Sequence, residues 1–507
     1  MATLLAGALT LGAVTVPAAQ ARDHLDSTPL RKAITTQGVF RHMQALDDIA
    51  TANGGERASG TPGYQASVDY IVDQLLPLGY DMTIQPFQFL YFDELTPAEF
   101  QQVSPEAKDY VGNEDFAIMT YSGSGDVTAP VQGVDLLLPP TGGSTSGCEA
   151  EDFAGFTSGN VALVQRGTCT FLQKAQNAQA AGAAAVVIFN EGNDEARVDL
   201  LTGTLGEPGI EIPVIGTSFA VGQELADSSA TGETVVRVKT DSVTETRVTY
   251  NVFADTPTGR ENRRVIAGAH LDSVADSPGM NDNASGTAAL LETAIQWSAL
   301  GIEPRNQVRF AFWGAEELGL LGAEYYVQNL SEREREQIGI YLNFDVLASI
   351  NGYPFVYTPT EGDGSPARSA EAAQVFHDYF DAVNLPADPT PLLPGASDHV
   401  AFLEAGIPAG GLFSGATEIK TEAQAEAYGG TAGEPFDELI NSPFDTIDRV
   451  NRPVLINMSD AAAHGIFVFA FDRFRQPTME TADVQVGTLA TTDEPAVDSW
   501  TTQLPDS

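Results

Sequence analysis

Apolar, strand-like runs alternate with amphipathic helical segments through the second half of this 507-residue chain. The strand-like runs are RRVIAGAH, VRFAFWGAEE and YLNFDVL, at residues 263–270, 308–317 and 341–347. Segments with helical spacing lie between and after them: TALLETAIQWSAL, SEREREQIGIYL, AEAAQVFHDYFDAV and LINMSDAAAHGIFVFAF. This alternation predicts parallel strands joined by crossover helices. We therefore expect an α/β fold with a mixed, mostly parallel central sheet flanked by helices.

Each of the three runs ends on side chains that bind metal ions. His270 ends the first run, Glu316 and Glu317 end the second, and Asp345 ends the third, while Asp282 lies in the loop PGMNDNASG after the first. Because ligands bind beyond the carboxyl ends of the strands in open parallel sheets, we expect these side chains to lie together. Neutral imidazole and carboxylates suit Zn²⁺, and two ions that share a carboxylate activate water. The sequence therefore predicts a two-metal hydrolase centre.

Between about residues 115 and 240 the chain changes to short β-rich runs, which predict a separate domain inserted into the main fold. The runs are VDLLLP, NVALVQRG, AAVVIFN and IPVIGTS, with one helical segment, FLQKAQNAQAAGA. The two cysteines, Cys148 and Cys169, fall within this insert. In an exported protein such a pair predicts one disulfide, which closes a loop of about 20 residues and stabilises by about 3 kcal/mol; two buried free thiols are the alternative. Residues 147–191 closely resemble the protease-associated (PA) domain, which commonly carries a disulfide here.

Residues 246–470 resemble, nearly end to end, the secreted di-zinc aminopeptidases of the phosphorylase/hydrolase-like α/β fold. The matching motifs are GAHLDSV, PGMNDNASG, FWGAEELGLLGAEYYV, YLNFDVL, SDHVAF, GIPAGGLFSGA and YGGTAG. By this resemblance His270 and Asp345 hold one zinc, Asp282 bridges two, and Glu317 holds the second. Glu316 would be the general base, because one of two successive glutamates can ligate while its neighbour accepts the proton of the water.

The resemblance also implies the reaction, and one motif departs from it. The implied reaction releases an N-terminal amino acid by means of a metal-activated water, with an apolar side chain in a pocket near Phe413. Family members place Tyr-His where this chain has Ile440–Asn441, in PFDELINSPFDTID. In the family this histidine completes the second zinc site and the tyrosine hydroxyl stabilises the oxyanion, whereas isoleucine donates no hydrogen bond. The asparagine carbonyl oxygen of Asn441 is a poorer zinc ligand than imidazole.

The other histidines offer no obvious replacement for the missing ligand. His24 lies beside the expected signal cleavage region, and His42 lies in an N-terminal helical segment, VFRHMQALDDIATA. His377 and His464 lie on later helical segments, and His399 matches a family position that is not a ligand. We therefore expect one zinc site with a full ligand set and a second one that relies on Asn441.

The charge balance limits the partners. The chain has 69 Asp+Glu against 25 Lys+Arg, a net charge of −44. Such a surface is typical of a protein adapted to salt or to an acidic medium, and a merely soluble acidic protein is the alternative. Because nucleic acids and anionic membranes are polyanions, binding to either is disfavoured. The expected partners are peptide substrates, and the expected state is a monomer.

The two ends of the chain differ from its middle. Residues 1–21 predict a signal peptide cut near Ala21, with an N-terminal anchor as the alternative. We expect no further segment to cross a bilayer and a secreted or periplasmic/extracellular location. We expect an N-terminal part of the peptidase domain at residues 30–114 and a PA insert at 115–240. The main zinc peptidase domain is expected at 241–473 and an acidic, flexible tail at 474–507.

Three functions are consistent with the sequence. The first is a secreted zinc-dependent aminopeptidase that removes N-terminal apolar residues. A dipeptidase or carboxypeptidase activity falls within the same class, because enzymes on one fold differ in their pocket loops. The second is a catalytically impaired homologue that binds peptides, which Ile440–Asn441 motivates. A non-peptidase hydrolase or acyltransferase on the same scaffold is a third.

Overall fold

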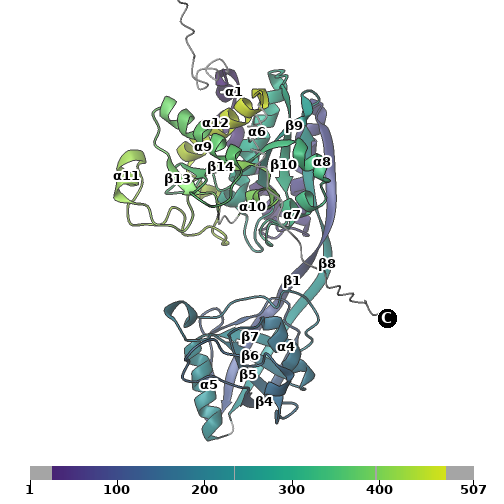
Figure 1. The fold of residues 1–507 in the computed structure, drawn as a ribbon, viewed down its shortest axis with the longest axis vertical. Coiled ribbons are helices and arrows are strands. Elements are labelled where there is room, and N and C mark those ends of the chain that lie inside the picture. The colour runs from purple at the N-terminus through teal and green to yellow at the C-terminus, as the bar shows by residue number, and fades with distance from the viewer. Residues whose placement is uncertain (1–25, 233, 394–396, 475–507) are drawn as a thin grey trace, which may run out of the picture.

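Two lobes joined by a long two-stranded ribbon make up the protein (Figure 1). The computed structural model describes residues 26–474 except 233 and 394–396. The predicted signal peptide and, apart from Phe474, the predicted acidic tail lie outside the described residues. The larger lobe contains the alternating strands and helices, and the smaller lobe is the β-rich insert.

The larger lobe has a mostly parallel sheet, as expected. The strand order is β13-β12-β14-β11-β9-β10-β8, and β14, β11, β9 and β10 are parallel neighbours. Strand β8 is antiparallel to β10, and β12 is antiparallel to β14. The bounds are β8 Val235–Asp255, β9 Arg260–His270, β10 Asn306–Trp313, β11 Ile338–Phe344, β12 Phe355–Thr358, β13 Asp388–Pro391 and β14 Ala409–Phe413.

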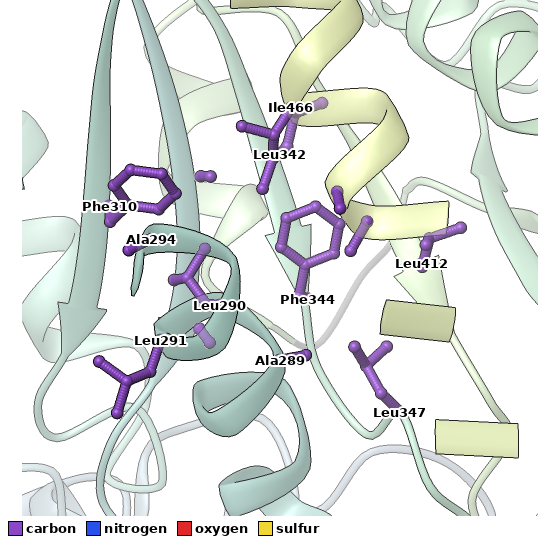
Figure 2. Close-up of a cluster of buried hydrophobic side chains, with 14 of the residues drawn as sticks. Ala289, Leu290, Leu291, Ala294, Phe310, Leu342, Phe344, Leu347, Leu412 and Ile466 are labelled. Atoms are coloured by element: carbon purple, nitrogen blue, oxygen red, sulfur yellow. The ribbon is translucent and has the colours of Figure 1, made fainter. Parts of the chain in front are cut away.

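Helices cover both faces of this sheet. One face packs against α6 and α12, where Leu290, Phe344 and Ile466 meet in the main core (Figure 2). The other face packs against α7 and α10 around Trp313 and Phe402. The bounds are α1 Thr28–Ala33, α2 Thr36–Ala52, α3 Pro62–Leu75, α6 Ser285–Ala299, α7 Leu321–Gln328, α8 Glu332–Gln337, α9 Ala367–Ala382, α10 His399–Glu404, α11 Glu422–Tyr428 and α12 Arg452–Phe471.

One expected feature of this lobe needs correction. The helix predicted over SEREREQIGIYL ends at Gln337, because the apolar run from Ile338 onward is a buried strand, β11. By length and composition alone α12 could cross a membrane, so the expected absence of a membrane-crossing segment after the N-terminus stays a prediction. In the structure 67% of the most apolar window of α12 is buried inside the protein.

The smaller lobe has a sheet in the order β4-β5-β6-β7-β3, with α4 and α5 packed on it. The bounds are β3 Phe116–Ile118, β4 Gly125–Gly133, β5 Val161–Gln165, β6 Ala185–Phe189, β7 Val214–Thr217, α4 Phe171–Ala180 and α5 Phe219–Thr231. The strand predicted at VDLLLP is wrong, because β4 ends before it and the segment has no regular structure. Asp135 has φ +43°, and Pro139 has no N–H for a strand ladder.

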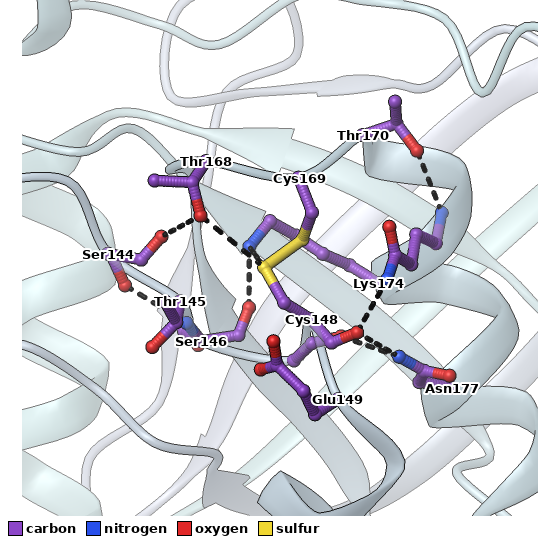
Figure 3. Close-up of a disulfide and its surroundings, with 12 residues drawn as sticks. Ser144, Thr145, Ser146, Cys148, Glu149, Thr168, Cys169, Thr170, Lys174 and Asn177 are labelled. Atoms are coloured by element: carbon purple, nitrogen blue, oxygen red, sulfur yellow. Dashed lines mark hydrogen bonds between the residues drawn. A yellow bond between two sulfur atoms is a disulfide. The ribbon is translucent and has the colours of Figure 1, made fainter. Parts of the chain in front are cut away.

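The predicted disulfide between Cys148 and Cys169 is confirmed, and it joins the loop before β5 to the start of α4 (Figure 3). The backbone carbonyl of Cys148 accepts hydrogen bonds from Gln173 Nε2 (2.7 Å) and Asn177 Nδ2 (2.8 Å). The ammonium group of Lys174 is buried beside it and donates to the carbonyl of Ser146. The disulfide therefore fixes the loop on the first turns of α4.

Strands β1 (Asp81–Ser104) and β8 form the ribbon between the lobes (Figure 1). They pair antiparallel from Asp81↔Asp255 at the larger lobe to Ser104↔Val235 at the smaller one. The short strand β2 (Lys108–Asp109) pairs with the far end of β1. Phe100 of β1 packs in the core of the smaller lobe. Strands β1 and β8 each extend from one lobe into the other, so no strand end marks the boundary between the lobes. The domain boundaries predicted from the sequence remain a prediction.

Candidate metal centre

The ends of β9, β10 and β11 meet at one edge of the sheet. The three strands are parallel neighbours with β9 in the middle, and His270 pairs in register with Trp313 of β10. The residues that follow β10 and β11 therefore flank His270. Ala315 and Val346 have φ values of +54° and +56°, so the chain turns sharply as it leaves each strand.

At this edge, carboxylates surround the outer ring nitrogen of His270. Its Nε2 lies 2.9 Å from Asp282 Oδ1 and 3.1 Å from Asp345 Oδ1. Glu316 Oε2 lies 3.9 Å from the same nitrogen. The other ring nitrogen, Nδ1, faces the carbonyl of Asp272 at 3.1 Å. A hydrogen bond from Nδ1–H to this carbonyl leaves Nε2 free to act as a ligand.

The side chains form two overlapping groups, each with ligand atoms within 4.8 Å of one another: His270 with Glu316 and Asp345, and His270 with Asp282 and Glu317. The two successive glutamates, Glu316 and Glu317, thus belong to different groups. Glu317 Oε1 is buried and has no hydrogen-bond partner among the described residues. Burying several carboxylates without compensation is costly. The residues present therefore fit a divalent cation, and their nitrogen and oxygen donors suit Zn²⁺.

Burial and mutual repulsion set the electrostatics of the site. Burial, followed by the charges of Asp345 and Asp398, raises the pKa of Glu316 well above its ordinary value. Burial alone would lower the pKa of His270, but the carboxylates of Asp345 and Glu316 raise it well above its ordinary value. A bound cation would favour the ionised carboxylates and the neutral imidazole instead. The acidic side chains thus give the site a strong preference for positive charge.

The loop that carries Asp282 is held from two distant parts of the chain. The backbone N–H groups of Asn281 and Asp282 donate to the two oxygens of the Asp445 carboxylate, at 2.8 and 3.0 Å. The fully buried guanidinium of Arg57 donates to the carbonyls of Leu271, Pro278 (3.0 Å) and Gly279 (2.9 Å). Sequence reasoning missed both Arg57 and Asp445, because no local pattern marks a residue that stabilises a remote loop.

A hydrogen bond positions Asp345, and the acidic side chain of Asp398 interacts with it. Its Oδ2 accepts a hydrogen bond of 2.6 Å from Ser397 Oγ, which in turn accepts one of 2.8 Å from Asn343 Nδ2. Both carboxylate oxygens of Asp398 are buried without a hydrogen-bond partner among the described residues. Burial and the charge of Asp345 raise the pKa of Asp398 well above its ordinary value. Ser397 of the SDH motif thus positions a candidate ligand, Asp345. The sequence position of the motif did not reveal this role.

The residues at the departure from the family pattern lie on a loop, Leu439–Phe444, next to the Asp282 loop. Ser277 Oγ donates to the carbonyl of Ser442 at 2.7 Å. Asn441 is exposed, with φ +55°, and Ile440 is half-buried. Asn441 makes no hydrogen bond through its side chain in the part of the chain that the structure describes. Its predicted role as a metal ligand remains a prediction.

Phe413, the predicted pocket residue, ends β14 and is half-buried. Strand β14 is the parallel neighbour of β11, so Phe413 lies at the same edge of the sheet as Asp345. Its ring lies 6.2 Å from those of Phe355 and Tyr357, measured between centroids. An aromatic group therefore lies at the same edge of the sheet as the acidic site, and the apolar pocket near Phe413 remains a prediction.

None of the other histidines in the described residues joins the carboxylate groups around His270. His42 is buried and lies 3.0 Å from Glu292 Oε2. His399 is buried against Tyr357, and burial lowers its pKa to about 4. His464 lies 2.8 Å from Ser27 Oγ. His24 lies outside the described residues.

Comparison with family models agrees with this architecture. Residues 251–466 match the model of peptidase family M28, and residues 127–225 match that of the PA domain. An aminopeptidase of Pseudomonas aeruginosa is 45% identical over 449 residues, which cover 87% of this chain and 82% of the relative. The chain belongs to peptidase family M28. It is a metallo-aminopeptidase by class, a hydrolase with an inserted PA domain.

Other relatives and solved structures are similar over most of their length. A probable lipoprotein aminopeptidase of Mycobacterium tuberculosis is 38% identical over 87% of this chain and 86% of its own length. The aminopeptidase from Aneurinibacillus sp. strain AM-1 has a TM-score of 0.65 at 28% identity, covering 87% of this chain and 95% of that one. The structure of BSAP, a zinc aminopeptidase from Bacillus subtilis, has a TM-score of 0.58 at 25% identity, covering 85% and 94%.

Proposed function

We propose that this chain is a zinc-dependent aminopeptidase that removes N-terminal residues, preferably apolar ones, from peptides. The observation that carries the proposal is the convergence of one imidazole and four carboxylates at the ends of three parallel strands. The similar zinc aminopeptidase BSAP supports zinc as the metal. His270, Asp282 and Asp345 would hold the first ion, and Asp282 with Glu317 the second.

When bound, zinc would polarise the scissile carbonyl and activate water for the attack. The carboxylate of Glu316 would accept a proton from the attacking water and return it to the leaving amine. Its position beside His270 and its burial keep this carboxylate out of bulk water. The acidic surroundings attract the cationic N-terminus of a peptide and repel its C-terminal carboxylate. This charge distribution favours an aminopeptidase over a carboxypeptidase.

The preference for an apolar first residue rests on the aromatic group at Phe413. Phe413, Phe355 and Tyr357 lie beside the acidic edge of the sheet, and Ile440 adds an apolar side chain on the neighbouring loop. An apolar side chain buried here gains roughly 1.5–3 kcal/mol. The printed name of one relative, a probable leucine aminopeptidase of Aspergillus fumigatus that is 37% identical, agrees with this preference.

The number of ions follows from the loop Leu439–Phe444. An asparagine carbonyl oxygen binds zinc less well than imidazole, so the second ion is held more weakly than the first. We further propose export from the cytoplasm, with residues 1–21 as the signal peptide, and a monomeric state. The disulfide between Cys148 and Cys169 supports export, since such bonds persist in oxidising compartments.

Release of p-nitroaniline from Leu-p-nitroanilide tests the activity directly. We expect turnover that a chelator abolishes and added zinc restores. Metal analysis should give one zinc per chain that survives gel filtration, with a second bound only in excess zinc. If no aminoacyl or peptide substrate shows chelator-sensitive turnover, the proposed activity is wrong.

A second candidate function is a peptide-binding homologue with little catalysis. The observation that favours it is Ile440–Asn441, which removes a histidine ligand and a tyrosine hydroxyl from the family pattern. Loss of one oxyanion donor typically lowers the rate by about 10²–10³. The double variant Ile440→Tyr with Asn441→His should then raise turnover by a similar factor and tighten the second zinc. An unchanged rate and zinc content would remove the basis of this candidate.

A further inference from the structure

A groove of about 920 Å³ extends from Glu317, one of the candidate ligands, to the PA lobe. Its wall on the larger lobe continues from Glu317 along α7 to Gln328. Its floor is formed by residues 87–90 and Phe92 of β1 with Thr246 of β8, and Tyr121 of the PA lobe closes the far side. The volume is that of a typical ligand site, roughly 300–1,000 Å³. Because Glu317 belongs to both, the groove adjoins the candidate metal centre.

The lining of the groove combines aromatic rings with uncharged polar side chains and lacks positive charge. Phe87 stacks on Tyr325 with 5.1 Å between centroids, and Phe92 meets Tyr121 edge-on at 5.9 Å. Among the described residues, the lining contains no lysine, arginine or histidine, and its charged members are Glu317 and Glu324. A C-terminal carboxylate would therefore find no cationic partner there. The groove suits the uncharged middle of a longer chain.

One strand on the floor of the groove has an unpaired edge. Over Phe87–Phe92, β1 pairs with β8 and, within the described residues, with no other strand. The hydroxyl of Tyr121 donates a hydrogen bond of 3.5 Å to the carbonyl of Leu90, so this carbonyl already has a partner within the protein. An unpaired strand edge offers N–H and C=O groups that an extended peptide can bind as an added strand. Both the side chains and the backbone of the groove thus fit an extended peptide.

We propose that this groove binds the part of a peptide substrate that follows the scissile bond, lying extended along β1 between α7 and the PA lobe. The enzyme then prefers peptides of several residues over dipeptides. It favours apolar or aromatic residues after the second position and disfavours acidic ones, because Glu317 and Glu324 face them. This inference rests on the proposed aminopeptidase function, and it gives the PA lobe a direct role in substrate selection.

A substrate series with a constant N-terminal leucine tests the length preference. The probes are Leu-p-nitroanilide, Leu-Ala, the amide of Leu-Ala-Ala-Phe-Ala and the amide of Leu-Ala-Ala-Glu-Ala. We expect kcat/KM for the phenylalanine peptide to exceed that for Leu-Ala by at least about tenfold, as one well-buried apolar side chain provides. The glutamate peptide should fall well below the phenylalanine peptide. Equal values for all peptides, with Leu-p-nitroanilide still cleaved, would overturn the groove proposal alone.

A bulky substitution in the groove, compared with one elsewhere on the ribbon, tests whether the groove binds the peptide. Gln88 is exposed on β1 and lines the groove, whereas Ile84 is 46% exposed on the same strand outside it. Gln88→Trp should lower the ratio of kcat/KM for the phenylalanine peptide to that for Leu-p-nitroanilide by about tenfold. The matched variant Ile84→Trp should leave this ratio unchanged. Equal effects of the two variants would show that the groove does not bind the peptide.

A charge reversal should increase kcat/KM for one substrate relative to another, and misfolding cannot produce such an increase. Glu324→Lys should raise kcat/KM for the glutamate peptide relative to the phenylalanine peptide, while Glu332→Lys, on the exposed start of α8, should not. Fluorescence anisotropy of both peptides, labelled at the C-terminus, gives the same comparison without turnover. If no substrate is cleaved but Glu324→Lys selectively tightens the glutamate peptide, the proposed activity fails and the groove stands. No selective change in either readout would overturn the groove.

Discussion

The two sides of the metal centre are built on different kinds of support. His270 ends strand β9 and Asp345 follows its neighbour β11, and the Asp282 loop is bound by Arg57 and Asp445. The other side is the loop Leu439–Phe444, where Asn441 is exposed and Phe444 is 63% exposed. The chain departs from the family pattern on the exposed loop, while the strand ends keep the expected side chains. Candidate ligands at strand ends are thus fixed by the sheet, whereas a candidate ligand on a surface loop can change without disturbing it.

The largest effect is expected at the strand ends. His270→Ala removes the residue shared by both candidate metal groups. We expect kcat/KM on Leu-p-nitroanilide to fall by at least about 10³, because several kcal/mol of metal-derived stabilisation are lost. Zinc per chain should fall with it. The control His377→Ala, on α9, should keep both, and retained activity in His270→Ala would contradict the comparison.

Glu316→Gln tests whether Glu316 acts as a general base or as a metal ligand, which sharpens the comparison. As a general base, Glu316 contributes about 10²–10⁴ to the rate. The variant should therefore lose kcat by that factor while keeping its zinc and its affinity for a peptide. Because Glu316 also lies within reach of His270 and Asp345, loss of zinc together with activity would make it a ligand instead.

Asp445→Asn breaks the link between the two sides. Asp445 is buried and accepts from the N–H groups of Asn281 and Asp282, and an amide has only one acceptor oxygen. We expect zinc affinity to fall about 10–100-fold, the usual effect of losing a group that orients a ligand. Titration with a competing chelator measures this change. Asp448→Asn, exposed on the same segment, should leave zinc affinity unchanged.

The smallest effect is expected on the exposed loop itself. Phe444→Ser changes a side chain that is 63% exposed. The free energy of unfolding should change by no more than about 0.5 kcal/mol, as surface substitutions usually do. Urea denaturation measures it. A destabilisation of several kcal/mol would show that the loop is packed more firmly than the comparison assumes.

Sequence reasoning predicted the parts of the site that follow local patterns. The apolar runs before His270 and Asp345 predicted strands β9 and β11, which are confirmed, and the polar side chains at or after the strand ends predicted the candidate ligands, which stay a prediction. Arg57 and Asp445 had no such pattern, because each acts on a loop more than 150 residues away in sequence. The groove also could not be predicted, since its walls come from β1, α7 and the PA lobe. Only the tertiary structure brings these segments together.

The ribbon between the lobes also affects the order of folding. Ser104 and Val235 are paired at its far end, although the whole PA insert separates them in sequence. Closing a long flexible loop costs conformational entropy, and distant contacts form slowly. A folded insert holds these two residues side by side, so that β1 and β8 can pair from this end toward the larger lobe. We therefore expect the PA lobe to fold early and to template the pairing through which β1 joins the central sheet.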